Sequence, residues 1–447
     1  MVTAIDRFAR APHARTGTWR DSLAVGQQYA FEVDLDACTG CKACVTGCHT
    51  MNGLDEGELW RTVGLLHGGS ALAPVQQTVT TSCHHCVEPA CMIGCPAEAY
   101  EKDPRTGIVR HLADHCIGCQ YCTFTCPYEA PKYNAARGIV RKCDLCAARL
   151  ERSEAPACVE ACPNGAIAIR AVDREAVLER HSFVAAAAPP DGTLPTTHYE
   201  TRRALPPNLL PADFYSVHRE DAHPSLAFML VLMQLSVGAF ALAGPRSIAL
   251  GAALLGLAVS LFHLGQPQRA WRAVLGLRRS WLSREIVAFG VFAALAVLGA
   301  PRWWIVAAGA AGLGCSVMVY ATTQRALWNA PLVTFKFFGT ATLLGLACAG
   351  RPLLLAAAML TKLAVEVSLL RHVGDLRHTP LKRAAILMTR DLRGTTELRF
   401  LAGVLGGCVL AWFAPWAALA SCVAGELLER HLFFVASVPP RMPGGLA

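Results

Sequence analysis

Sixteen cysteines grouped in four quartets constrain this 447-residue chain more than any other feature of its sequence. The quartets are Cys38, Cys41, Cys44 and Cys48; Cys83, Cys86, Cys91 and Cys95; Cys116, Cys119, Cys122 and Cys126; and Cys143, Cys146, Cys158 and Cys162. The first and third have the spacing C-x2-C-x2-C-x3-C, in which three thiolates hold one [4Fe–4S] cluster and the fourth serves a second cluster. We therefore expect four [4Fe–4S] clusters.

The spacing also separates iron–sulfur clusters from other uses of cysteine. C-x2-C motifs also hold zinc, but a zinc site has no use for the repeated third and fourth cysteines. Residues 1–30 contain neither an apolar secretory segment nor a twin-arginine pair, so we expect a cytosolic domain, in which disulfides are rare. Four further cysteines stand alone in apolar segments and are expected to be packing residues: Cys315, Cys348, Cys408 and Cys422.

Glycines and strand-like stretches indicate the local fold around the quartets. Gly40 and Gly118 permit tight turns between cysteines, and we expect the fourth cysteine of a quartet to begin a short helix. Strand-like stretches at residues 31–33 and 167–169 flank the quartets. We predict an α+β, ferredoxin-like domain over residues 31–175, built from two tandem bacterial-ferredoxin pairs, with an N-terminal extension at residues 1–30.

The second half of the chain has a different composition. Residues 176–222 are rich in Ala, Pro and Thr, which predicts an extended strap or linker. Beyond them, apolar blocks of about 18–22 residues are each long enough for a helix that crosses the bilayer. We count eight blocks, at residues 225–243, 247–264, 284–300, 303–322, 332–349, 353–371, 398–414 and 416–436. They predict an all-α membrane domain of about eight helices over residues 223–437, followed by a C-terminal tail at residues 438–447.

Lysine and arginine lie almost entirely on one side of this arrangement. The loops after the second, fourth and sixth blocks hold thirteen Lys or Arg residues, whereas the opposite loops hold only Arg246, Arg302 and Arg351. By the positive-inside rule the first side is cytoplasmic, and the cysteine domain shares it. Membrane topology thus explains the formal charge of +8, and we do not expect nucleic-acid binding. We expect a multi-pass protein of the bacterial inner (cytoplasmic) membrane.

Three segments carry a family resemblance: CIGCQYCTFTCPYEAPKYN, KCDLC and CVEACPNGAI, at residues 116–134, 142–146 and 158–167. They closely resemble the four-cluster electron-transfer subunits of the dimethyl sulfoxide reductase family of molybdoenzymes. The resemblance implies that quartets one and four share a pair of clusters, as do quartets two and three. The implied ligand sets are Cys38, Cys41, Cys44 with Cys162; Cys143, Cys146, Cys158 with Cys48; Cys83, Cys86, Cys91 with Cys126; and Cys116, Cys119, Cys122 with Cys95.

A looser resemblance covers the membrane half. A His-Leu-Gly turn at His263 and a Glu-Ile pair at Glu285 resemble the quinol site of the eight-helix anchor subunit in the same family. The candidate quinol-binding residues are His263, Arg269, Arg284, Glu285 and Glu426. Quinol oxidation needs a hydrogen-bonding group and a base, and imidazole is the side chain that ordinarily titrates near neutral pH. Alternatively, the histidine is an interfacial residue and the arginines only anchor the topology.

Other ionisable residues in the apolar blocks have simpler interpretations. Lys362 and Glu366 stand four apart and share a helix face, so we expect a structural ion pair, with a part in proton movement as the alternative. A b-type haem needs two histidines on facing helices. Apart from His263, the histidines near the blocks lie at block ends: His223, His372 and His431. We therefore expect no haem.

The two resemblances together imply an iron–sulfur subunit fused to its membrane anchor. Such a protein passes electrons between the quinone pool, menaquinol or ubiquinol, and a separate molybdopterin-containing catalytic subunit of the dimethyl sulfoxide or other S- or N-oxide reductase type. No centre for the terminal substrate is expected in this chain. Three alternatives stay open: the reverse flow from a cytoplasm-facing sulfite dehydrogenase into quinone, an ion-translocating quinone-linked module, and a scaffold without a quinone site of its own.

Overall fold

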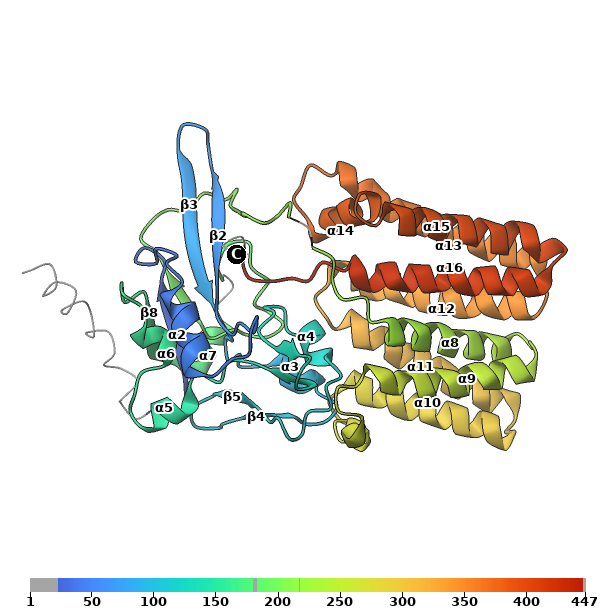
Figure 1. The fold of residues 1–447 in the computed structure, drawn as a ribbon, viewed down its shortest axis with the longest axis horizontal. Coiled ribbons are helices and arrows are strands. Elements are labelled where there is room, and N and C mark those ends of the chain that lie inside the picture. The colour runs from blue at the N-terminus through green and yellow to red at the C-terminus, as the bar shows by residue number, and fades with distance from the viewer. Residues whose placement is uncertain (1–22, 180–182, 217, 445–447) are drawn as a thin grey trace, which may run out of the picture. The chain divides into compact units, whose positions relative to one another are not determined.

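The computed structural model describes residues 23–179, 183–216 and 218–444 of the chain (Figure 1). The chain divides into two compact units. The first contains residues 1–116, 120–216 and 440–447, and the second contains residues 117–119 and 217–439. Most of the predicted N-terminal extension, residues 1–22, lies outside the described residues.

Strands from both ends of the cysteine-rich region frame the first unit. β1 (Gln27–Asp34) pairs with β8 (Ile167–Asp173) in antiparallel register and with β9 (His198–Glu200) in parallel register. Buried and partly exposed residues nearly alternate along β1, as expected for a strand with one face on a core. The strands predicted at residues 31–33 and 167–169 are therefore confirmed.

Within the described residues of the first unit, three hairpins and six short helices complete the fold. The hairpins are β2 (Thr62–Gly69) with β3 (Pro74–Thr81), β4 (Tyr100–Lys102) with β5 (Val109–His111), and β6 (Lys132–Asn134) with β7 (Ile139–Arg141). The helices are α2 (Ala43–Met51), α3 (Ala90–Gly94), α4 (Tyr121–Thr125), α5 (Ala147–Glu151), α6 (Ala157–Glu160) and α7 (Arg174–Leu178). This is the small α+β fold that the sequence predicts.

The segment interpreted as a strap or linker belongs to the first unit. Its strands β9 and β10 (Leu210–Pro211) add to β1 and β2. Thr196 is fully buried, and its hydroxyl donates a hydrogen bond to the His84 carbonyl oxygen at 2.7 Å. Residues 183–216 therefore form a strap packed on the domain.

The last described residues also belong to the first unit. The Leu65 amide donates a hydrogen bond to the Gly444 carbonyl oxygen at 3.0 Å. A Cβ atom on Gly64 would lie 1.7 Å from the Pro443 carbonyl oxygen, so the tail fits only because Gly64 has no side chain. Met442 is 5% exposed and packs in the hydrophobic core beside β2 and β3. The tail thus completes part of the core of the first unit.

The second unit is helical. Its long helices are α8 (Pro224–Ala241), α9 (Arg246–Ser260), α10 (Trp281–Leu298), α11 (Arg302–Ala321), α12 (Ala330–Cys348), α13 (Pro352–Leu370) and α16 (Pro415–Val435). Shorter helices α14 (Pro380–Thr389) and α15 (Arg393–Val404) connect the last two. Gly238 on α8 and Gly345 on α12 allow close packing, since a Cβ atom on Gly238 would lie 1.8 Å from the Ala341 carbonyl oxygen.

Among the described residues, six helices are long and apolar enough to cross a membrane. They are α8 to α13, with α9 extended to His263 and α13 to Gly374. The predicted seventh block, residues 398–414, overlaps only the second half of α15, which has 12 residues and continues into a π-helical turn at Leu405–Val409. The predicted eighth block is α16, which carries Glu426, Glu429 and Arg430. Six apolar helices are thus found, and a count of eight crossings stays a prediction.

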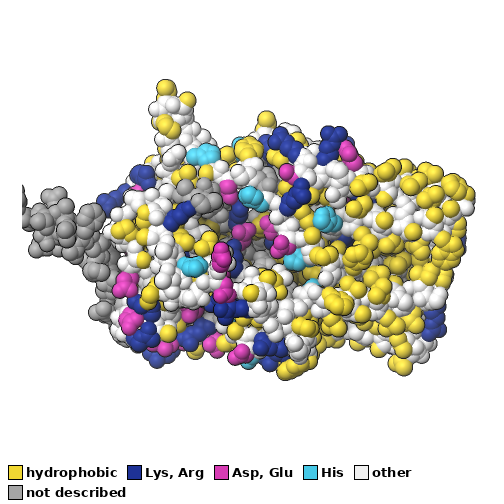
Figure 2. Space-filling view, in the orientation of Figure 1, with side chains coloured by type: hydrophobic (Ala, Val, Ile, Leu, Met, Phe, Trp, Pro, Cys, Tyr) yellow, Lys and Arg dark blue, Asp and Glu magenta, His cyan; other side chains and the backbone are white. Residues whose placement is uncertain are grey.

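Side-chain chemistry distinguishes the two units. Figure 2 shows hydrophobic side chains spread over the outer face of the helical unit, while most charged side chains lie over the iron–sulfur unit. Exposed Trp303, Trp304, Trp412 and Trp416 stand near helix ends, where aromatic side chains favour a membrane interface.

Candidate iron–sulfur and membrane sites

The quartet loops share an unusual backbone. Gly40 and Gly118 have φ values of 74° and 70°, in the left-handed region that glycine adopts without strain. In the fourth quartet Leu145 takes the same role with φ of 61°, and in the second His85 has φ of 42°. The tight turns predicted at the two glycines are therefore confirmed, and two of the four quartets make such turns without glycine.

The short helices carry the third cysteine and finish at or near the fourth. Cys44 and Cys48 both lie in α2, while Cys95 and Cys126 directly follow α3 and α4. The expectation that the fourth cysteine begins a helix was wrong. In quartets one and three, a left-handed residue after the second cysteine starts the helix instead, Lys42 for α2 and Gln120 for α4.

These helices pack in two pairs. α2 contacts α6 and α3 contacts α4, so quartet one meets quartet four and quartet two meets quartet three. A Cβ atom on Gly47 would lie 2.5 Å from Cβ of Ala161, which explains the small residue at the first of these contacts. The same two pairs of quartets are those that the family resemblance links.

Thiols from the first and fourth quartets are electrostatic neighbours. Burial raises the pKa of Cys44, and the charges of Cys162 and Cys38 raise it further. Burial likewise raises the pKa of Cys48 to about 12, with added contributions from Cys158 and Cys146.

The Asn52 side chain bridges these two quartets. Its amide donates a hydrogen bond to Sγ of Cys48 at 3.6 Å and contacts Sγ of Cys146 at 3.9 Å. Cys48 thus lies beside cysteines of the fourth quartet.

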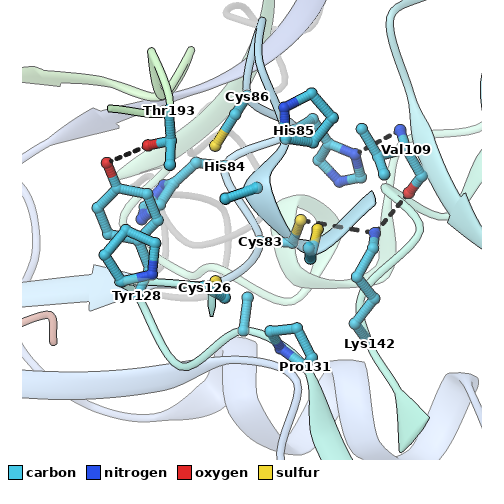
Figure 3. A pocket seen from close by; sticks show the side chains of 15 residues that line it. Cys83, His84, His85, Cys86, Val109, Cys126, Tyr128, Pro131, Lys142 and Thr193 are labelled. Carbon is cyan, nitrogen blue, oxygen red and sulfur yellow. Dashed lines mark hydrogen bonds between the residues drawn. The ribbon is translucent and has the colours of Figure 1, made fainter. Parts of the chain in front are cut away.

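Thiols from the second and third quartets are neighbours in the same way. Burial raises the pKa of Cys86, and nearby Cys83 and Cys126 raise it further. Burial also raises the pKa of Cys95, to which Cys116 contributes. Four cysteines of these two quartets line one pocket: Cys83, Cys86, Cys91 and Cys126 (Figure 3).

Two buried cations lie among the cysteines, and no pattern in the sequence singles out either of them. Arg61 is 2% exposed, donates to Thr80 Oγ1 at 3.2 Å and to Ser82 Oγ at 2.9 Å, and interacts electrostatically with Cys158 and Cys44. Burial works against the charge of Lys142, but nearby thiolates, led by Cys83, outweigh it and raise the pKa of this lysine. Thiolates take the place that carboxylates usually hold beside a buried cation.

The candidate quinol-binding residues of the helical unit lie on several elements and do not form one cluster as the cysteines do. His263 ends the 3-10 turn after α9, and its buried Nδ1 has no hydrogen-bond partner among the described residues. Glu285 on α10 is 3% exposed and accepts a hydrogen bond from the Ser316 hydroxyl on α11. No hydrogen bond joins His263 to Glu285 within the part of the chain that the structure describes. Arg284 donates to the carbonyl oxygens of Leu277 and Arg278, in keeping with an anchoring role.

Glu426 belongs instead to a buried charge network in the helical unit. Seven residues from four helices form it: Lys336, Lys362, Glu366, Arg399, Glu426, Glu429 and Arg430. Lys336 Nζ lies 2.6 Å from Glu429 Oε1, and Arg399 Nη2 lies 2.9 Å from Glu426 Oε1. The predicted pairing of Lys362 with Glu366 was wrong, since Lys362 pairs with Glu426 and Glu366 pairs with Arg399 at 2.8 Å. Facing helices supply nearer partners than the next turn of α13 does.

A cysteine-rich α+β unit followed by a bundle containing six apolar helices defines a membrane-bound iron–sulfur protein of electron transport. Residues 75–172 match the family model of the 4Fe-4S dicluster domain, and residues 245–311 match that of the DMSO reductase anchor subunit (DmsC). Both halves of the chain therefore have a family of their own.

Curated relatives agree with these matches. The chain is 36% identical over 180 residues to the probable anaerobic dimethyl sulfoxide reductase chain YnfG of Escherichia coli strain K12, which is 38% of this chain and 84% of the relative. The same figures hold for a chain of the anaerobic dimethyl sulfoxide reductase of that organism. A subunit of the sulfite dehydrogenase of Allochromatium vinosum is 36% identical over 205 residues, which is 39% of this chain and 84% of the relative. The protein belongs to the family of dimethyl sulfoxide reductase iron–sulfur subunits, here fused to an anchor of the DmsC family.

Proposed function

We propose that this chain passes electrons between the quinone pool and a separate molybdopterin-containing subunit that carries the terminal reaction. The observation that carries the proposal is the pairwise packing of the quartets, which brings cysteines from distant sequence positions together. Relatives are chains of dimethyl sulfoxide reductases, which supports a catalytic partner of that class.

The donor set fits four [4Fe–4S] clusters. Sixteen free cysteines are available, most of them buried, and the backbone amides of Ala99 and Ala166 point at Sγ of Cys95 and Cys162 at 3.3 and 3.2 Å. We assign the clusters to Cys38, Cys41, Cys44, Cys162; Cys143, Cys146, Cys158, Cys48; Cys83, Cys86, Cys91, Cys126; and Cys116, Cys119, Cys122, Cys95. Bound clusters would supply one-electron redox chemistry.

The quinol site is proposed near His263. An imidazole with an unpartnered, buried ring nitrogen is suited to hold a quinol hydroxyl, and Glu285 is a buried carboxyl on the neighbouring helix α10. The other two candidates lie on different elements, Arg269 in the 3-10 helix Pro267–Val274 and Arg284 in the first turn of α10. The part of Glu426 stays a prediction, and its contacts with Lys362 and Arg399 favour a structural role.

Tail packing supports the proposed topology. Residues before the first apolar helix and residues after α16 belong to the same unit, which supports an even number of membrane crossings between them. With the positive-inside rule, this favours iron–sulfur and C-terminal segments that both face the cytoplasm of a bacterial inner membrane. A reporter fused after residue 444 tests this directly, and a periplasmic signal would contradict it.

Purification of the tagged full chain in mild detergent tests the proposal as a whole. We expect roughly sixteen iron atoms per chain, four for each cluster, and a large molybdenum-containing partner identified by mass spectrometry. His263→Ala should abolish reduction of the clusters by a quinol analogue while iron content stays unchanged. Full quinol oxidation by that variant would place the quinone site on another subunit, as the scaffold alternative requires.

A second candidate is the reverse flow, from sulfite to quinone. The similarity to the sulfite dehydrogenase subunit is as high as that to the reductase chains, so sequence identity does not separate the two. Midpoint potentials measured for each cluster discriminate them, because uniformly low potentials would oppose electron flow from sulfite into quinone.

A further inference from the structure

Three side chains with polar nitrogen atoms line the same pocket as Cys83, Cys86, Cys91 and Cys126: His84, His85 and Lys142 (Figure 3). The ring of His84 is hydrogen-bonded to Thr197 Oγ1 at 2.8 Å. The other two, Lys142 and His85, are 3% and 1% exposed. Neither side chain binds iron in the proposed assignment.

Lys142 reaches this pocket from the fourth quartet. It directly precedes Cys143, and its ammonium group donates to Sγ of Cys83 at 3.5 Å and to the Cys143 carbonyl oxygen at 2.8 Å. A third hydrogen bond goes to the Val109 carbonyl oxygen. All three protons therefore have protein acceptors, and one of those acceptors is a cluster-ligand sulfur.

His85 faces the pocket with one free donor. The Val109 amide donates to Nδ1 at 3.1 Å, so the ring proton resides on Nε2 in the neutral imidazole. Nε2 is buried and has no hydrogen-bond partner among the described residues. Because a buried N–H without an acceptor is unfavourable, we expect this donor to find an acceptor in the pocket that His85 lines. Val109 thus fixes both side chains, His85 through its amide and Lys142 through its carbonyl (Figure 3).

We infer that Lys142 and His85 are positioning residues that raise the reduction potential of the cluster held by Cys83, Cys86, Cys91 and Cys126. Reduction adds negative charge to a cluster, so a buried cation that donates to a ligand sulfur and a buried N–H donor that lines the same pocket stabilise the reduced form more than the oxidised form. The inference rests on the proposed assignment of these four cysteines to one cluster.

The chain contains a matched control for the lysine. Lys102 donates to the carbonyl oxygens of Cys86 and Val87 at 3.0 and 2.8 Å, so it serves the same quartet without contacting a thiol. Its loss removes a lysine near the cluster but no hydrogen bond to a ligand sulfur.

Redox titration of the full-length protein with its partner, followed by electron paramagnetic resonance, tests the inference. Lys142→Met should shift one midpoint to more negative potential by at least a tenfold change in equilibrium, which is about 59 mV for a one-electron couple. His85→Phe should shift the same signal in the same direction, by less. Lys142→Arg should leave it in place, and Lys102→Met, which removes a more exposed cation and no hydrogen bond to sulfur, should shift it by less than Lys142→Met does. A Lys142→Met protein with all its iron and an unshifted midpoint would overturn the inference.

Two further measurements keep the test decisive. If Lys142→Met loses its cluster, the His85→Phe variant takes its place in the test. The coupling of exchangeable protons to the reduced cluster is then compared in H2O and D2O for the wild type and for His85→Phe. A midpoint and a proton coupling that are both unchanged in His85→Phe would overturn the proposal. Cys86→Ser identifies the signal by removing it. If Cys86→Ser leaves four normal signals, the cluster assignment itself fails, whereas an intact but unshifted cluster in the lysine variant refutes only the inference.

Discussion

Both units of this molecule bury cations, but they balance them with different partners. In the iron–sulfur unit Arg61 and Lys142 face thiol groups of the quartets. In the helical unit Lys336, Lys362 and Arg399 face carboxylates on neighbouring helices. The difference teaches that the helical unit carries its own counter-charges, whereas the iron–sulfur unit depends on sulfur ligands whose charge is set by the metal they bind.

The largest expected effect comes from removing iron. Without clusters the thiols no longer stay ionised, and the cations Arg61 and Lys142 lose their counter-charge in a buried site. We expect chelation of iron to make the first unit sensitive to protease while the helical unit stays resistant. Loss of both units at the same chelator concentration would contradict the contrast between them.

Breaking one carboxylate pair should destabilise the helical unit by a smaller amount. Lys362 is buried and donates to Thr340 Oγ1 at 2.7 Å as well as to Glu426. Lys362→Met removes one of the two cations beside the buried Glu426 carboxylate, which keeps Arg399 at 2.9 Å, so the loss should be smaller than the cost of a fully unpaired buried charge, about 3–5 kcal/mol. Thermal denaturation in detergent should show a lower midpoint without any change in the cluster signals.

An exposed pair in the same unit serves as its control. Arg393 and Glu397 form an ion pair with side chains 73% and 62% exposed. Arg393→Gln should change stability by less than about 0.5 kcal/mol. If Lys362→Met and Arg393→Gln lowered the denaturation midpoint equally, buried and exposed ion pairs would contribute alike to stability, contrary to our expectation. A Lys362→Met protein of normal stability that no longer moves protons would instead favour the ion-translocating alternative.

His111 is a buried histidine that stays neutral, and the effect of replacing it should be smaller than that of breaking a buried ion pair. Burial, followed by the charge of Lys142, lowers the pKa of His111 to about 4, below its unfolded value of 6.5. The unfolded chain therefore binds more protons below pH 6.5, and stability falls as the pH falls from 6.5 towards 4. Between pH 7 and 5.5, the free energy of unfolding of the first unit should therefore fall by about 1 kcal/mol less in His111→Leu than in the wild type. Identical melting curves for wild type and variant at both pH values would contradict this.

Local spacing predicted the parts of the site that depend on neighbours in sequence. The quartets, their turns at Gly40 and Gly118, and the flanking strands all follow from residues a few positions apart. Cluster pairing was implied by family resemblance alone, since nothing in the spacing links Cys48 to Cys146.

Long-range contacts explain what the sequence did not predict. Lys142 meets Cys83, 59 residues earlier, and such a contact is visible only after folding. Lys362 and Glu366 satisfied a helical pairing rule, yet surface pairs of that kind are weak and the packed helices offered better partners. A signal for the charge network did exist, because Lys336, Arg399 and Glu429 are ionisable residues within or beside apolar blocks.

The packing of Met442 in the core beside β2 and β3 has a consequence for biosynthesis. The ribosome makes the iron–sulfur domain first, but Met442 joins the core of that domain only when the residues that follow α16 emerge. A polypeptide that is truncated within the helical unit therefore exposes the hydrophobic residues that Met442 would cover beside β2. Maturation of the electron carrier is in this way made conditional on completion of its anchor, and incomplete copies present a surface that cellular proteolysis recognises.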